Sequence, residues 1–151
     1  METKTLITNS MRRAIGTESP ALTTEIEAGA IRKFAEAIGD SNPLYHDKFF
    51  AEKSPYGSII APPTFLRSLE IELVEVPETA SLENLLDAGS EWEYFRPVHA
   101  GDLITAITLL VDLKERSSKA IGQMLMISYE TGYKDHLGAL VAKQRSTFIR
   151  Y

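Results

Sequence analysis

The chain has 151 residues, of which 44% are hydrophobic, with a formal net charge of −5 and no cysteine. This length fits one globular domain with a substantial core. The acidic balance argues against a nucleic-acid partner, and the lack of cysteine excludes disulfides, thiolate metal sites and a cysteine nucleophile. No apolar run approaches membrane-spanning length and no secretory signal is visible, so we expect a cytoplasmic protein without a membrane partner.

The first part of the chain predicts one strand and one helix. Residues 1–20 are polar and predict an irregular N-terminal arm, and a threonine-rich run predicts a short strand at 22–26. An apolar stripe at helical spacing follows, formed by Ile31, Phe34, Ala35 and Ile38. Gly39 comes next, at a position where a left-handed residue commonly ends a helix.

The middle of the chain predicts a loop and a second helix. Residues 40–56 read as a loop with one short helical turn near 47–53, and Pro62 and Pro63 exclude a regular strand. Apolar residues on one side then predict a helix over 64–76, and 77–88 reads as a connection.

The C-terminal half predicts consecutive long strands. We expect them at 90–98, 103–113, 121–133 and 140–149, with turns at 114–119 and 134–138. In the longest strand the alternation follows the odd positions Leu103, Thr105, Ile107, Leu109, Val111 and Leu113. An early helix followed by such strands predicts an α+β fold with an antiparallel sheet.

A cluster of polar and ionisable residues follows the first predicted helix. Asp40, Asn42, Tyr45, His46 and Asp47 surround a proline within eight positions. Side chains that carry protons or form hydrogen bonds, gathered at a helix exit, are suited to general acid–base chemistry.

These residues resemble the signature of the MaoC-like dehydratases and (R)-specific enoyl-thioester hydratases. The resemblance extends over roughly 20–150 and rests on four motifs in the same order: AEAIGDSNPLYHD, IAPPTFL, WEYFRPVHAGD and GALVAKQRSTFIR. It implies a single hot-dog fold, in which a curved antiparallel sheet wraps around a central helix. The expected organisation is an arm at 1–20 and a hot-dog domain of the N-terminal, non-catalytic-half type at 21–151.

In that family an Asp-x-Asn-Pro-x-His motif handles the proton and the water, and a backbone N–H from a downstream His-Gly pair binds the enolate oxygen. Asp40 and Asn42 match the motif, but Tyr45 falls on the histidine position and His46 lies one residue late. Ala61 and Pro62 fall on the His-Gly pair, and proline has no N–H to donate. The resemblance therefore implies altered catalytic parts.

The candidate catalytic residues are Asp40 and His46, and the alternative for Asp40 is that it ends the helix or caps the next turn. The implied ligand is an acyl thioester of coenzyme A or acyl carrier protein, with its acyl chain beside the central helix and the loop at 54–66. The expected substrate-binding residues are Asn42, Tyr45, Tyr56, Gly57, Ala61, Pro62 and Thr64. No cofactor is expected, and the three scattered histidines do not form a metal-binding pattern.

Three roles fit this pattern. The first is a subunit of an (R)-3-hydroxyacyl-thioester dehydratase or 2-enoyl-thioester hydratase, which shapes the acyl tunnel beside a second hot-dog subunit with the intact motif. The second is an autonomous homodimeric hydratase that uses Asp40 and His46. The third is a non-catalytic protein that binds acyl thioesters. A hot-dog sheet with an unprotected edge predicts a dimer in each case.

Overall fold

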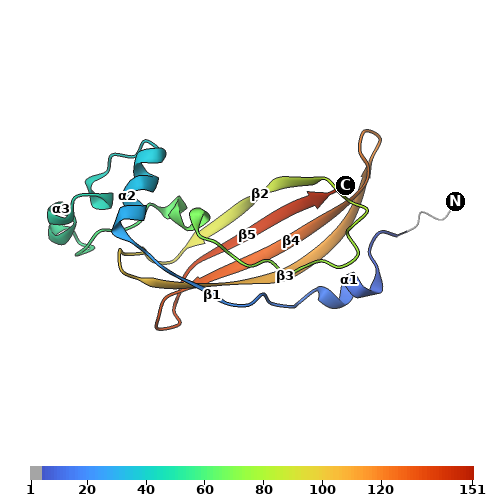
Figure 1. Cartoon of the computed structure of the whole chain (residues 1–151), viewed down its shortest axis with the longest axis horizontal. Coiled ribbons are helices and arrows are strands. Elements are labelled where there is room, and N and C mark those ends of the chain that lie inside the picture. The colour runs from blue at the N-terminus through green and yellow to red at the C-terminus, as the bar shows by residue number, and fades with distance from the viewer. Residues whose placement is uncertain (1–4) are drawn as a thin grey trace.

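The computed structural model describes residues 5–151 and contains one antiparallel sheet with helical segments gathered mostly at one end (Figure 1). In chain order the elements are α1 (Asn9–Ala14), β1 (Leu22–Glu25), α2 (Ala28–Ala37), the 3₁₀ helix η1 (Pro43–Tyr45), α3 (Lys48–Lys53), the 3₁₀ helix η2 (Pro63–Ser68), β2 (Leu85–Tyr94), β3 (Leu103–Ser118), β4 (Gly122–Lys134) and β5 (Leu140–Arg150). This is the α+β architecture that the sequence predicted. Within the described residues no helix is long and apolar enough to cross a membrane.

The sheet has the order β1-β3-β4-β5-β2, and every neighbouring pair is antiparallel. The short strand β1 forms one edge, and the ten-residue strand β2 forms the other. On β3 the buried side chains are the even-numbered Ile104, Ala106, Thr108 and Leu110. A register shift after Leu110 then turns the odd-numbered Leu113 to the buried face.

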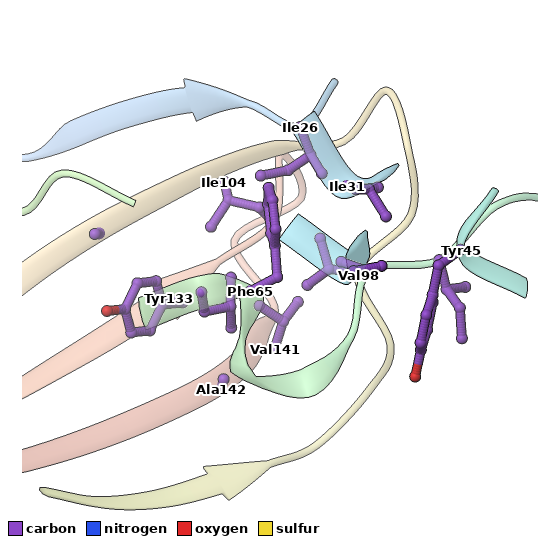
Figure 2. Packing of buried hydrophobic residues seen from close by; sticks show 14 residues of the cluster. Ile26, Ile31, Tyr45, Phe65, Val98, Ile104, Tyr133, Val141 and Ala142 are labelled. Carbon is purple, nitrogen blue, oxygen red and sulfur yellow. The ribbon is translucent and has the colours of Figure 1, made fainter. Parts of the chain in front are cut away.

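The core consists of two hydrophobic clusters on the helix-bearing face of the sheet. The first joins Ile31 of α2 and Phe65 of η2 to sheet residues such as Tyr133 and Val141 (Figure 2). The second joins Met11 of α1 and Val76 of the 69–84 connection to the far ends of β3 and β4. Between the clusters Thr108 and Thr131 are fully buried, and their hydroxyl oxygens lie 2.8 Å apart in a hydrogen bond. This bond satisfies two polar groups that would otherwise be costly to bury.

The expectation of an irregular arm at 1–20 was wrong for residues 9–14, which form α1. Thr8 caps this helix by accepting a hydrogen bond from the Met11 N–H, and the Met11 side chain is buried. Residues 16–19 then exchange backbone hydrogen bonds with β3, for example from Ser19 N–H to the Thr108 carbonyl. Residues 1–4 of the predicted arm lie outside the described part of the chain.

The predicted helix over 64–76 was wrong beyond Ser68. Only η2 is helical, and its C-terminal neighbour Leu69 has an extended backbone with ψ of 142°. Leu69 and Ile71 pack on the first cluster, whereas Val74 and Val76 pack on the second. An extended chain rises about 3.3 Å per residue against 1.5 Å for a helix, so only the extended form reaches both clusters.

Two of the predicted strands differ in their boundaries from the structure. β2 begins at Leu85, inside the predicted connection, and ends at Tyr94 rather than near 98. β3 continues through the predicted turn at 114–119 as far as Ser118, because it pairs with β4 up to Gly122. The predicted strands at 22–26, 121–133 and 140–149 agree with β1, β4 and β5 to within one residue at each end.

Candidate functional site

Helix α2 ends in a backbone arrangement that places Asp40 at the start of the loop. Gly39 has φ of 71°, a conformation that glycine adopts without a steric penalty, and its N–H bonds the carbonyl of Glu36. The N–H of Asp40 bonds the carbonyl of Ala35, which completes a Schellman motif. The sequence prediction that Gly39 ends the helix is confirmed.

The next two turns are held by side chains of the polar cluster. The Asp40 carboxylate accepts a hydrogen bond from the Asn42 N–H at 3.0 Å, and the Asn42 side chain accepts one from the Leu44 N–H at 3.1 Å. Asp47 caps α3 by accepting from the Phe50 N–H. Asp40, Asn42 and Asp47 therefore each have a structural role in local turns, as such residues often do.

The main candidate site is a pocket of about 400 Å³ where this loop meets the end of β2. Of the expected site residues, Asn42, Tyr45, Tyr56, Ala61 and Pro62 line it. The opposite wall comes from 94–98, where Tyr94, Phe95 and Arg96 follow the edge strand. We call this hollow the main pocket. It is a concave, largely apolar space with a few polar groups, which is typical of small-molecule sites.

Tyr45 supplies a hydroxyl with a raised pKa to the main pocket. Figure 2 shows its ring at the margin of the first core cluster, with the hydroxyl directed away from the other labelled residues, and only 8% of the residue is exposed. Burial, with smaller contributions from Asp40 and Tyr56, raises the pKa of Tyr45 above its usual 10.0, and a hydrogen bond with Asn42 acts in the opposite direction. The hydroxyl is therefore neutral at pH 7 and can hold or orient a polar group, but it is a poor base.

The backbone beside Tyr45 offers no N–H at the two positions of the family's His-Gly pair. The N–H of Ala61 already donates to the carbonyl of Val98 at 2.8 Å. Pro62 has no N–H and is almost fully buried. These two residues form a closed wall of the main pocket rather than a hydrogen-bond donor for an oxyanion.

Asp40 and His46 lie elsewhere, on a second hollow formed with Arg32 and Glu36 of α2. His46 is exposed, and its Nε2 lies 3.2 Å from the carbonyl oxygen of Ser41. Neither residue lines the main pocket, although Tyr45 and Asn42 between them do. The structure thus separates the two candidate catalytic residues from most of the expected substrate-binding residues.

Gly57 and Thr64 line neither hollow. Gly57 has φ of 72° and bonds the Ser54 carbonyl through its N–H, so its role in the structure is to turn the chain. Thr64 is exposed on η2. Among the described residues no group of histidine, aspartate and glutamate side chains is arranged to hold a metal ion.

Sequence reasoning missed the wall at 94–98 and the contact that positions Tyr56. His99 is half-buried, and its ring Nε2 lies 3.2 Å from the Tyr56 carbonyl oxygen. Its backbone N–H donates to the Asp102 carboxylate at 2.8 Å. These contacts connect the loop at Tyr56 to the turn between β2 and β3 that contains His99 and Asp102. In the sequence, this wall could have been suspected from the aromatic and basic run Tyr94-Phe95-Arg96 next to a proline. Only the tertiary structure places that run opposite Tyr45.

Residues 13–144 match the model of the FAS1-like dehydratase domain region. A UPF0336 protein of Thermobifida fusca is 37% identical over 111 residues, covering 70% of this chain and 71% of that protein.

Two solved structures illustrate the likeness in fold. The MaoC-like dehydratase from Rhodospirillum rubrum has a TM-score of 0.71 at 20% identity and covers 91% of this chain and 92% of that one. A chain of the HadBC (3R-hydroxyacyl-ACP dehydratase) complex from Mycobacterium tuberculosis has a TM-score of 0.70 at 19% identity. The match covers 90% of this chain and 96% of the mycobacterial chain. The hot-dog fold that the resemblance implied is confirmed.

Proposed function

Because the chain belongs to the family of FAS1-like dehydratase domain regions, we propose that it is a subunit of an (R)-3-hydroxyacyl-thioester dehydratase or 2-enoyl-thioester hydratase. In this proposal the main pocket shapes the space for the acyl chain. A second hot-dog subunit with an intact Asp-x-Asn-Pro-x-His motif moves the protons. The mycobacterial dehydratase of similar fold is itself a complex, which supports a two-subunit arrangement.

The observation that carries this proposal is the chemistry of the main pocket. Dehydration needs a base for the proton next to the carbonyl, an acid for the departing hydroxyl, and a donor for the enolate oxygen. Tyr45 is neutral at pH 7, the Ala61 N–H is occupied, and Pro62 has none. One lost oxyanion donor alone costs on the order of 10²–10³ in rate. These properties support a role of the pocket in binding an acyl group rather than in transforming it.

The position of the edge strand supports a partner subunit. Most of β2 is exposed, and its last residue, Tyr94, lines the main pocket. Leu85 and Leu86 at the other end of β2 are 57% and 48% exposed. Exposed strand edges pair readily with another chain. A partner on β2 would therefore cover apolar surface and extend the wall of the pocket.

An autonomous hydratase is the second candidate, and one observation favours it. Asp40 and His46 line the same hollow, so an acid and a base are within one space. Against this candidate, the Asp40 carboxylate is already engaged by the Asn42 N–H and His46 bonds the loop backbone. Within the described residues no hydrogen bond joins the two side chains.

Hydration of crotonyl-CoA and longer 2-enoyl-CoA thioesters by the purified chain tests the proposal. We expect little or no hydration by the chain alone, and activity once a hot-dog partner with the intact motif is added. Robust hydration by the lone chain, abolished by His46→Ala, would replace the subunit role with the autonomous enzyme. Acyl-thioester binding without activity in either preparation would instead establish a non-catalytic binding protein.

A further inference from the structure

A third hollow adjoins the main pocket on the outside of α3. It has a volume of about 440 Å³ and is lined by Leu44, Phe50, Lys53, Ser54, Pro55 and Tyr56. Leu44 and Tyr56 also line the main pocket, so the two hollows share a boundary made by these two side chains. We call this hollow the α3 groove.

The walls of the α3 groove are apolar and open to solvent. Phe50 is 50% exposed and Tyr56 is 43% exposed, and the neighbouring Phe49 reaches 73%. Two adjacent aromatic side chains left exposed on a short surface helix are unusual for a surface without a binding role. The groove therefore presents apolar surface directly beside the proposed acyl site.

One cation borders this apolar surface without a carboxylate partner. The Lys53 ammonium lies 5.3 Å from the centre of the Phe49 ring, within the range of a cation–π contact. Within residues 5–151 no acidic side chain forms an ion pair with Lys53. By contrast, Lys48 on the same helix lies 3.8 Å from Glu52. Lys53 is thus available to an anionic group in the groove.

We infer that the α3 groove binds the phosphopantetheine arm of the acyl thioester, an inference that rests on the proposed function. With the acyl chain in the main pocket, the arm passes the boundary of Leu44 and Tyr56. Its pantetheine part lies over Phe50 and Pro55, and its phosphate pairs with Lys53. Because the whole chain carries a net charge of −5, a local cation is needed to attract an anionic ligand.

Coenzyme A and acyl carrier protein both present this arm, so the inference concerns the chemistry that they share. Binding of 4′-phosphopantetheine and of phosphate-free pantetheine, measured by calorimetry on the full chain, separates the roles of phosphate and arm. Lys53→Gln is the test variant, and Lys48→Gln is its control because it removes the same charge from the same helix. Phe50→Ser tests the apolar wall.

We expect Lys53→Gln to weaken 4′-phosphopantetheine binding by on the order of five- to tenfold while pantetheine binding is unchanged. Lys48→Gln should leave the affinity for both ligands unchanged, and Phe50→Ser should weaken the binding of both. The effect of Lys53→Gln should fade as salt is raised, because an exposed charge pair is screened. A similar loss of affinity in Lys53→Gln for crotonyl-CoA, for crotonyl-carrier protein or for both would support the site. The thioester that shows this loss identifies which carrier the site accepts.

If Lys53→Gln and Lys48→Gln weaken 4′-phosphopantetheine binding equally, the attraction is a general effect of charge. That result would overturn the inference that the arm binds in the α3 groove. The inference would also be overturned if the chain binds crotonyl-pantetheine but Lys53→Gln leaves its affinity for 4′-phosphopantetheine unchanged. In that case the proposed function would stand. Failure of the chain and of its assembled complex to bind crotonyl-pantetheine at all would remove the proposed function and this inference together.

Discussion

The side chain of Tyr45 is held in the main pocket by the turn that precedes it. Asp40 and Asn42 each accept a backbone N–H, and Pro43 begins η1, which ends at Tyr45. The same polar residues that provide catalytic groups in the family here fix the backbone. Their presence in the sequence is therefore compatible with a binding role as well as with catalysis.

Replacing Asp40 by asparagine separates these two roles. The asparagine side-chain oxygen can still accept the Asn42 N–H, but it cannot carry a proton. On the proposed subunit role, turnover of the assembled complex should stay within about threefold, since Asp40 does not line the main pocket. A drop of at least roughly 10²-fold with unchanged folding would mark Asp40 as a positioned acid or base. Single-turnover kinetics of the complex measures the turnover, and circular dichroism of the variant shows whether its folding is unchanged.

Contacts close in sequence could be predicted, but contacts across the fold could not. The left-handed Gly39 and the turn at Asn42-Pro43 follow from residue type, and both occur. The separation of Asp40 and His46 from the main pocket depends on how the chain leaves α2 at Asp40 and the short 3₁₀ helix η1 at His46, which spacing alone does not define. The wall at Phe95 depends on the pairing of β2 with β5, a contact distant in sequence.

At the scale of elements, the errors occurred where apolar residues fit two patterns. Residues 64–76 carry apolar side chains at helical spacing, yet Leu69, Ile71, Val74 and Val76 also suit an extended chain that joins two clusters. On β3 both faces are apolar, so alternation indicated the odd positions, whereas Thr108 is buried through its bond to Thr131. Tertiary packing decided between the patterns in both cases.

Residues 5–7 are attached to β3 through the carboxylate of Glu115. Glu115 accepts hydrogen bonds from the Thr5 hydroxyl and, at 2.6 Å, from the Ile7 N–H. These two bonds, with a smaller contribution from the charge of Arg12, hold the pKa of Glu115 below its ordinary 4.5. The attachment is therefore present when Glu115 is ionised.

We expect the stability that Glu115 contributes to depend on pH. A lowered folded-state pKa means that this contribution is complete above about pH 4.5 and is lost as the pH falls through the folded value. The melting temperature of the unmodified chain should exceed that of Glu115→Gln near neutral pH, and the difference should shrink below pH 4.5. Glu70→Gln, at an exposed position in the connection after η2, is the control. A constant difference between the two proteins down to pH 3 would contradict the prediction.

For the whole molecule, the arrangement of edges indicates where a second chain fits. At one edge, β1 and residues 16–19 pair along β3, so that side offers only the four-residue strand β1 to a partner. The edge formed by β2 is open over ten residues and leads directly to the main pocket. A partner is therefore expected at β2, in the same place for a homodimer and for a complex with a second hot-dog subunit.

A charge placed on β2 should separate the subunits. Leu86 is 48% exposed on the edge strand, and Leu86→Glu would bury an unpaired carboxylate in an interface along β2. We expect sedimentation at micromolar concentration to show a dimer of the unmodified chain, or a complex with its partner. The variant should weaken that association by at least about tenfold. Leu137→Glu is the matched control, because Leu137 is 80% exposed in the turn before β5, whereas Leu86 pairs with Ile149 at the other end of β5. A strict monomer both alone and with the intact-motif partner would refute association through β2, and equal weakening by the two variants would place the interface elsewhere.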